Sequence, residues 1–232
     1  MSSIFCLSGW GQKFDSIESF ISLPKSSNYQ ITSIDYSIYR GYKDFIAKIN
    51  FNSNPELIIG WSLGGQIALR LCADNILKPK KLILIAPPFQ LVKNQKIEAG
   101  MTEKLYEEFL KNLENSVDET MKKFAILSIM NDKNKSEILD NLLIDNNNSQ
   151  QLIIWLKELK EFSCFDLDFS KIPPTVYLMG KGDMIVHQLQ VKYFEQRIKN
   201  FSVKYFDNCG HAPHISNSSL FNQILQEQLL SC

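Results

Sequence analysis

Short apolar segments alternate with segments of helical spacing along the first part of the chain. Runs that are apolar almost throughout predict strands at residues 3–8, 30–35, 56–60 and 81–85. Apolar residues at helical spacing predict helices between these strands, at residues 14–23, 42–49 and 64–73. Strands without a polar face are typical of a parallel sheet that helices cover on both sides. The pattern therefore predicts an α/β fold.

The alternation of strands and helices is interrupted after residue 89. Between residues 90 and 165 no segment has a convincing strand pattern. Helices are predicted there at residues 101–113, 117–130, 135–143 and 149–161, with a break at Asn146, Asn147 and Asn148. Further along, strands are predicted at residues 175–179 and 201–206, and helices at about 187–199 and at 220–230. We therefore expect a core of residues 1–89 and 166–232, with a mostly parallel sheet of about six strands flanked by helices, and a helical lid inserted at residues 90–165.

Composition narrows the class of protein. Lys plus Arg and Asp plus Glu number 25 each, so no strong net charge is available to attract nucleic acid or an anionic membrane. No apolar run is long enough to span a bilayer, and the first residues lack the basic and apolar regions of a signal peptide. The five cysteines are scattered and form no Cys-x-x-Cys pair, which is typical of reduced thiols. We expect a monomeric cytoplasmic protein that binds neither nucleic acid nor membrane.

The sequence Gly60-Trp61-Ser62-Leu63-Gly64 is a G-x-S-x-G motif between a predicted strand and a predicted helix. In a nucleophile elbow, a serine occupies such a strained turn and its hydroxyl stands above the sheet. The residues two positions before and after the serine must be small, and both are glycines here. The helix behind the serine offers free N–H groups and a positive dipole to a developing oxyanion. Ser62 is therefore the candidate nucleophile, and a chance Gly-Ser-Gly turn is the alternative.

A serine hydroxyl is a weak nucleophile and needs a general base. The chain has three histidines, and His211 follows the predicted strand at 201–206 on a loop that contains Gly210. Such a loop can carry the imidazole back over the sheet to the serine. His187 is expected at the start of a surface helix, and His214 as a structural or pocket residue. His211 is therefore the candidate base.

The base in turn needs a carboxylate that fixes its tautomer and stabilises its charged form. Asp183 follows the predicted strand at 175–179, so it is expected beside the loop of His211. The order Ser62, Asp183, His211 is the order expected of triads in α/β-hydrolases. Taken alone, Asp183 could simply cap a turn. The carboxylates that could replace it are Asp166, Asp168 and Asp207.

An oxyanion hole needs two backbone N–H donors. Leu63, directly after the nucleophile, would supply one, and the loop after the first strand should supply the other. That loop contains Gly9, Trp10 and Gly11, and the N–H of Trp10 is the candidate, although these glycines could equally form a plain turn. Large side chains are candidates for the substrate pocket, with core packing as the alternative. They are Trp10, Trp61, Phe89 and Trp155.

One further spacing could indicate a metal site. Cys209, His211 and His214 form a Cys-x-His-x-x-His sequence, which resembles the spacing of metal ligands. No second cluster in the sequence completes a set of four ligands. We therefore expect neither a metal nor another cofactor.

These motifs resemble those of the α/β-hydrolase superfamily over most of the chain outside the insertion. Within it, the chain resembles the pimeloyl-[acyl-carrier protein] methyl ester esterases of biotin synthesis. The resemblance rests on residues 9–11, 60–65, 180–183 and 211–216, and the last of these is similar to a His-Ala-Pro-x-Ile-Ser sequence of that family. Residues 119–131 also resemble part of its helical lid. The chain departs from the family at Ser8, where the first-loop motif usually has His, and the N-terminal hairpin of the fold is expected to be missing.

The resemblance implies hydrolysis of the methyl ester of pimeloyl-acyl-carrier protein, through an acyl-enzyme on Ser62. It also implies an acyl carrier protein as partner. Residues 90–165 hold 10 Lys and no Arg against 13 Asp plus Glu, so any basic docking face must be local. The candidates for it are Lys122, Lys123, Lys133 and Lys135, which could also form a solvated helix face.

Two alternatives of different kinds stay open. The first is another carboxylesterase or thioesterase of the same fold that acts on a free small substrate, because the same triad serves both reactions. The second is a non-catalytic ligand-binding protein that keeps the fold.

Overall fold

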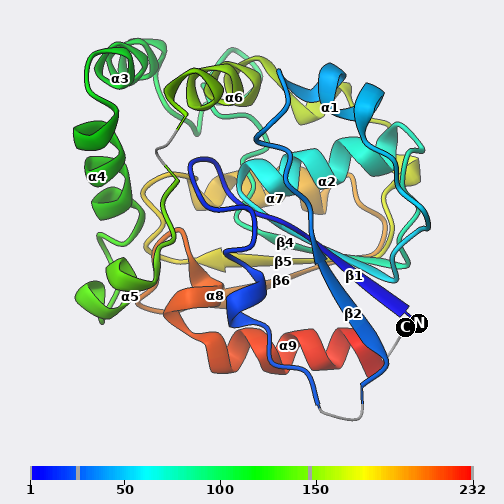
Figure 1. The fold of residues 1–232 in the computed structure, drawn as a ribbon. Helices are drawn as coiled ribbons and strands as arrows, with labels where there is room; N and C mark the ends of the chain where they lie inside the picture. The colour runs from blue at the N-terminus through cyan, green and yellow to red at the C-terminus, as the bar shows by residue number, and fades with distance from the viewer. Residues whose placement is uncertain (1, 25–26, 146–147, 231–232) are drawn as a thin grey trace.

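The centre of the molecule is a parallel sheet of six strands in the order β2-β1-β3-β4-β5-β6 (Figure 1). The structure is a computed structural model that describes residues 2–24, 27–145 and 148–230. The strands are β1 (Ser2–Leu7), β2 (Tyr29–Ser33), β3 (Leu57–Trp61), β4 (Lys81–Ile85), β5 (Thr175–Gly180) and β6 (Phe201–Phe206). The predicted α/β fold with a mostly parallel sheet of about six strands is confirmed.

An apolar cluster lies on each face of the sheet. Successive side chains of a strand point to opposite sides, so one strand contributes to both clusters. In β3, Ile58 packs in one apolar cluster and Ile59 in the other. One face is covered by α1 (Tyr42–Lys48), α2 (Leu63–Ala73) and α7 (Val191–Glu195), and the other by α9 (Ser218–Leu230) (Figure 1). This two-sided covering explains why the inner strands β1, β3, β4 and β5 are almost wholly buried, whereas the edge strands β2 and β6 are partly exposed.

A helical segment separates β4 from β5, as predicted. It contains α3 (Glu103–Asn115), α4 (Val117–Ser128), α5 (Lys135–Asn141) and α6 (Ser149–Glu161). Within the described part of residues 90–165 the extended contacts are isolated bridges rather than strands. Of the predicted break, Asn148 caps α6, whereas Asn146 and Asn147 lie outside the described residues.

The helical segment packs against the sheet core through α6. Arg70 of α2 forms an ion pair with Glu158 of α6, with 2.9 Å between nitrogen and oxygen. The same guanidinium lies 3.6 Å from the centre of the Tyr42 ring and 4.6 Å from that of Phe162. In Figure 1, α3, α4 and α5 lie beyond the carboxyl ends of the strands. The segment therefore stands over the edge of the sheet where the candidate site residues were expected.

The helix predicted at residues 14–23 is wrong. Only a short 3-10 helix, Glu18–Phe20, forms there. The segment instead wraps across the loop after β1, where Ser8 Oγ donates to the carbonyl of Phe14 at 2.9 Å and Ser16 Oγ donates to Ser8 Oγ at 2.9 Å. These side-chain hydrogen bonds favour a turn over a continuous helix, as serine often does.

The helix predicted at about 187–199 is shorter in the structure. A 3-10 turn, Gln188–Gln190, leads into α7, which ends at Glu195. The chain then turns at Phe194, whose carbonyl accepts from the N–H groups of Arg197 and Ile198 at 2.9 and 2.8 Å. The return to β6 therefore begins earlier than the apolar spacing indicated. The α8 helix (Pro213–Ser216), which was not predicted, precedes α9.

The sheet order reverses direction at β1, because β2 lies on one side of β1 while β3 to β6 continue on the other. Ligands of open parallel sheets bind beyond the carboxyl ends of the strands at such a reversal. The loops after β1 and β3 meet there and carry Trp10 and Ser62. Among the described residues, no helix has both the length and the apolar character that crossing a membrane requires.

Candidate active site

Ser62 occupies a strained turn between β3 and α2. Its φ and ψ are 52° and −117°, a left-handed region that a non-glycine residue rarely adopts. The turn is held by backbone hydrogen bonds, because the Ser62 N–H donates to Ile85 at 2.8 Å and the Ser62 carbonyl accepts from Gly65 at 3.0 Å. Ser62 is 5% exposed, so it has little contact with solvent.

The glycines on either side of Ser62 are required by space. A Cβ on Gly64 would collide with the backbone carbonyls of Leu7 and Ser8, and a Cβ on Gly60 would lie 2.7 Å from the carbonyl oxygen of Gly64. Real Cβ atoms do not approach backbone atoms this closely. The G-x-S-x-G pattern therefore reflects the close packing of the elbow against the end of β1.

Asp183 and His211 form a buried hydrogen-bonded pair. His211 Nδ1 lies 2.7 Å from Asp183 Oδ2, and the two side chains are 2% and 0% exposed. The other carboxylate oxygen, Oδ1, accepts from the N–H groups of Ile185 and Val186 at 2.8 and 2.9 Å. Asp183 is thus fixed on both oxygens, and it leaves Nε2 as the ring nitrogen of His211 that can exchange a proton.

The other ring nitrogen of His211 is buried without a partner. His211 Nε2 has no hydrogen bond within the described part of the chain, and none joins it to Ser62. The loop of His211 is nevertheless tied to the elbow, because Trp61 Nε1 donates to the His211 carbonyl at 2.9 Å. Trp61, directly before Ser62, therefore connects β3 to the loop that bears the imidazole.

The residues considered as alternatives to His211 and Asp183 lie in different surroundings. His187 is exposed, and its Nδ1 accepts from the N–H of Leu189 at 3.1 Å. His214 is fully buried, with its ring 4.7 Å from that of Trp61. Asp168 caps a 3-10 turn, Asp207 pairs with Lys181 at 2.6 Å, and Asp166 lies in another such turn. Of the described carboxylates, Asp183 is the one that contacts His211.

The candidate oxyanion donors lie at the two loops of the sheet reversal. Leu63 is the first residue of α2, so its N–H has no acceptor within the helix. Trp10 is held by its indole, whose Nε1 donates to Leu152 of α6 at 2.9 Å. Its ring packs edge-on against Phe109 and Phe124, with centroids 5.7 and 5.1 Å away. The loop after β1 is therefore fastened to the helical segment above it.

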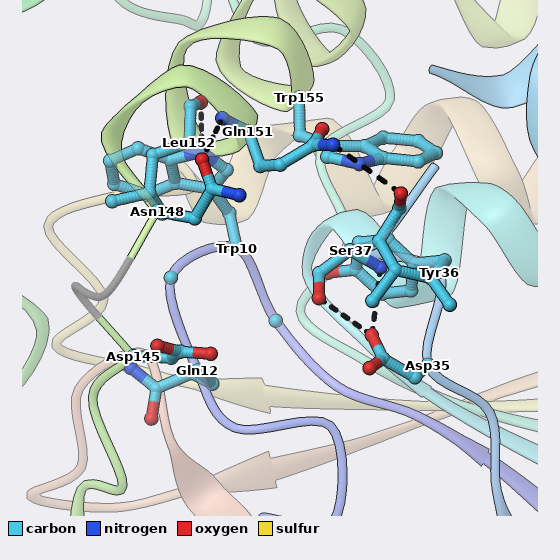
Figure 2. Close-up of a pocket in the computed structure, with 13 residues that line it drawn as sticks. Trp10, Gln12, Asp35, Tyr36, Ser37, Asp145, Asn148, Gln151, Leu152 and Trp155 are labelled. Carbon is cyan, nitrogen blue, oxygen red and sulfur yellow. Dashed lines mark hydrogen bonds between the residues drawn. The ribbon is translucent and has the colours of Figure 1, made fainter. Parts of the chain in front are cut away.

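A pocket of about 180 Å³ lies beside this loop (Figure 2). Two of the candidate pocket residues, Trp10 and Trp155, line it, together with Asp35 and Tyr36 at the end of β2 and Gln151 of α6. Figure 2 shows the residues that follow β2 on one side of it and the residues of α6 on the other. Asp35 and Tyr36 were not among the predicted site residues, although their place after a strand at the sheet reversal was a usable signal.

The other two candidate pocket residues lie elsewhere. Trp61 packs beneath the elbow against the rings of His211 and His214. Phe89 is fully buried among the rings of Phe165 and Phe194. Neither lines the pocket beside Trp10, because both are packed into the core. Trp61 and Phe89 therefore have the surroundings of core residues, which was the alternative considered for them.

The model of a family described as the alpha/beta hydrolase family matches residues 5–224. The chain belongs to the alpha/beta hydrolase family.

Relatives of this hydrolase bear a specific name. A pimeloyl-[acyl-carrier protein] methyl ester esterase of Nitrosospira multiformis is 25% identical over 185 residues, which cover 77% of this chain and 70% of that protein. A protein of the same name from Pseudoalteromonas atlantica is 28% identical over 222 residues, or 91% of this chain and 83% of the relative. The family and these names support a carboxylic ester hydrolase.

Solved structures give the same fold. An esterase from Exiguobacterium antarcticum superposes on this hydrolase with a TM-score of 0.85, covering 98% of this chain and 91% of that chain at 16% identity. At this identity the likeness shows the shared α/β-hydrolase fold.

The four candidate docking lysines are exposed on one stretch of the hydrolase. Lys122 and Lys123 lie on α4, and Lys133 and Lys135 follow between α4 and the start of α5. Two apolar side chains of this stretch are also exposed, Ile126 by 53% and Met130 by 40%. Because Lys122, Ile126 and Met130 are spaced four residues apart, the first two share a face of α4 and the third follows at its end. The stretch is both basic and apolar.

The Cys209, His211 and His214 spacing is not accompanied by a metal-like cluster. His211 is engaged with Asp183, and His214 is enclosed by Trp61, Phe20 and Phe221. The described residues contain no group of three or more His, Cys, Asp or Glu arranged to hold an ion.

His214 is expected to make stability depend on pH. Burial and the neighbouring His211 lower the pKa of His214 to about 3, from an ordinary value of 6.5. The folded state binds the proton less readily than the unfolded chain, so this contribution to stability is complete above pH 6.5 and is lost as pH falls towards 3. Between pH 7 and pH 5 the loss amounts to about 2 kcal/mol in the free energy of unfolding.

This expectation can be measured by urea unfolding of the native chain and of His214→Phe at pH 7 and pH 5. The variant should lose about 2 kcal/mol less than the native chain over this interval, because phenylalanine has no proton to bind. Equal losses in the two proteins would show that His214 is not held neutral by the fold.

Proposed function

We propose that this hydrolase is a serine esterase that removes the methyl group from pimeloyl-acyl-carrier protein methyl ester. The observation that carries the proposal is the buried pair of Asp183 and His211, on a loop that Trp61 ties to the strained elbow of Ser62. Ordinary turn-capping would not require an aspartate held on both oxygens and a histidine with a buried, unpartnered Nε2. A base oriented by a carboxylate does require them.

The proposed reaction begins with attack of Ser62 Oγ on the ester carbonyl carbon. His211 Nε2 takes the hydroxyl proton, and Asp183 stabilises the resulting imidazolium. The oxyanion receives hydrogen bonds from the N–H groups of Leu63 and Trp10, at the helix N-terminus and in the loop after β1. The bond to the methoxy oxygen then breaks, and His211 donates its proton to release methanol.

The second half of the reaction removes the acyl group from the enzyme. His211 takes a proton from water as the water oxygen attacks the acyl carbon. The bond to Ser62 Oγ breaks, and the serine recovers its proton from the imidazolium. The products are the free carboxylate of the pimeloyl chain and the original enzyme, so no cofactor is consumed.

The choice of substrate rests on the relatives and on the surface of α4. The relatives from Nitrosospira multiformis and Pseudoalteromonas atlantica are named for this reaction. Acyl carrier proteins are acidic, so a partner of this kind suits the basic stretch of Lys122, Lys123, Lys133 and Lys135. The exposed Ile126 and Met130 would supply the apolar contact that specific protein interfaces also need.

The test compares turnover of the methyl ester on the carrier protein with turnover of free dimethyl pimelate, followed by mass spectrometry. The proposal predicts that kcat/KM is at least about 100-fold higher for the carrier-bound ester, because docking adds binding energy. Turnover of the free ester alone would support a small-molecule esterase and would exclude a substrate bound to a carrier protein. Hydrolysis of acyl thioesters in preference to methyl esters would favour a thioesterase.

The basic stretch has its own test. Replacing Lys122, Lys123, Lys133 and Lys135 together by Glu is expected to raise KM for the carrier-bound ester about tenfold at low salt, since docking charges act mainly on association. Turnover of p-nitrophenyl butyrate should stay unchanged. The matched control replaces four exposed lysines outside residues 90–165, namely Lys171, Lys192, Lys199 and Lys204. An equal effect in both variants would exclude a specific docking site.

A further inference from the structure

The turn between α4 and α5 contacts both loops that bear the Asp183–His211 pair. Two backbone–backbone hydrogen bonds and two hydrogen bonds that involve a side chain join them. The His211 N–H donates to the carbonyl of Ser128 at 2.7 Å, and the Lys133 N–H donates to the carbonyl of Asn208 at 3.2 Å. On the acid loop, Asn131 Nδ2 donates to the carbonyl of Gly182 at 2.9 Å. The helical segment therefore supports the site from above as well as covering it.

The fourth contact comes from a buried carboxylate. Asp132 is 4% exposed, and its Oδ2 accepts from the N–H of Gly210 at 3.0 Å. The peptides of Gly210 and His211 are thus both held by the turn, the first by Asp132 and the second by Ser128. Since these two peptides directly precede the imidazole, they determine where the ring stands.

The packing at this point leaves no room for a different arrangement. A Cβ on Gly210 would collide with the carbonyl of Ser128 and would lie 2.7 Å from Asp132 Oδ2. A Cβ on Gly182 would collide with Asn131 in the same way. Both loops therefore approach the turn as closely as backbone allows, and glycine is needed at each point of contact.

A buried aspartate in this position is costly to the fold. Burial raises the pKa of Asp132 above its ordinary value, and hydrogen bonding from Ser216, from the N–H of Gly210 and from Cys209 only partly opposes this effect. Asp183 adds to the rise, because a second carboxylate stands nearby. Within the described chain, no ion pair with Lys or Arg compensates Asp132. Its stability cost indicates that the residue serves another purpose.

We propose that Asp132 is a positioning residue, which holds the loop of His211 so that Nε2 can take the proton of the Ser62 hydroxyl during the reaction. The inference rests on the proposed function, since it assigns Asp132 to the same site. It goes beyond that function by giving the helical segment a part in the chemistry. Asp132 touches neither substrate nor the reacting atoms, so it acts through His211.

The closest matched test replaces Asp132 by Asn and by Leu, which have similar shape. Asparagine keeps an oxygen that accepts from Gly210, whereas leucine keeps the volume and removes the acceptor. We expect Asp132→Leu to lower kcat about 10- to 100-fold with KM changed less than about twofold, because small displacements of a base cost this much. Asp132→Asn should recover kcat to within about threefold of the native enzyme.

A second measurement separates positioning from loss of folded protein. A fluorophosphonate labels the activated serine, so its final yield counts intact sites and its rate reports how well the base works. Asp132→Leu should reach a yield in proportion to the folded fraction, measured by circular dichroism, but react about 10- to 100-fold more slowly per site. Asp140→Leu, at an exposed aspartate of α5, is the control and should match the native rate.

The outcomes are distinct. A native rate per site in Asp132→Leu would overturn the role of Asp132 and leave the proposed function intact. The role of Asp132 would also be overturned if the asparagine and leucine variants slowed the enzyme equally, because the hydrogen-bond acceptor would then be irrelevant. If the native enzyme itself takes up no label and hydrolyses no ester, the proposed function fails and the inference fails with it.

Discussion

Replacing His211 by alanine is expected to lower kcat for ester hydrolysis by at least about 10⁴-fold, with little change in KM. The buried Nε2 of His211 is the group proposed to take the serine proton, and Ser62 at its ordinary acidity is a poor nucleophile. The Asp183 partner would remain in place without a base to orient. Initial rates on p-nitrophenyl butyrate at pH 8 measure the effect.

The control for this variant is His187→Ala, because His187 is an exposed histidine that caps a 3-10 turn. It should keep activity to within about twofold. Retention of more than about one tenth of native activity by His211→Ala would contradict the assignment of the base. A comparable loss in His187→Ala would transfer the role to that residue.

Replacing Gly64 by alanine is expected to lower the free energy of unfolding by more than about 3 kcal/mol and to abolish activity. The new Cβ would collide with the carbonyls of Leu7 and Ser8, which belong to β1 and its loop. Backbone in the middle of a parallel sheet cannot move aside as a flexible side chain can. The elbow must therefore shift, and Ser62 with it. Urea unfolding and ester hydrolysis measure the two effects.

A matched control lies in the same helix. Ala73→Gly at the end of α2 changes the same two residue types in the opposite sense and should cost only about 1 kcal/mol, with activity retained. If Gly64→Ala were as mild as this control, the close contact between the elbow and β1 would be wrong. The account of why the motif needs glycine would then lose its physical basis.

The helices and strands of this hydrolase are readily predicted from its sequence where an element buries either one face or all of its side chains. β3, and β4 after its first residue Lys81, are apolar because they lie inside the sheet between two neighbours and two helical layers. At residues 14–23 the same reasoning predicted a helix, and this prediction is wrong. The apolar side chains of this segment have helical spacing, yet Ser8 and Ser16 hold the chain in turns across the loop after β1. Contacts with another segment outweighed the local pattern.

The candidate site, too, was predicted only in part from the sequence. The contact of Asp183 with His211 was predicted, because both follow neighbouring strands of a parallel sheet. Their chemical roles stay predictions. Asp132 had no such signal, since it lies in the helical segment, follows no strand, and meets Gly210 across 78 positions of sequence. Trp61 and Phe89 pack into the core, the alternative that residue type alone could not separate from a place in the pocket, and their part in substrate binding stays a prediction.

The measurement that tests the central claim most directly is labelling of the native enzyme with a fluorophosphonate, followed by mass spectrometry of its peptides. We predict a single adduct on Ser62, formed rapidly in the native enzyme, slowly in His211→Ala and not at all in Ser62→Ala. Absence of an adduct in the native enzyme, or an adduct that forms at the same rate in Ser62→Ala, would contradict the assignment of Ser62 as the nucleophile of an ester hydrolase.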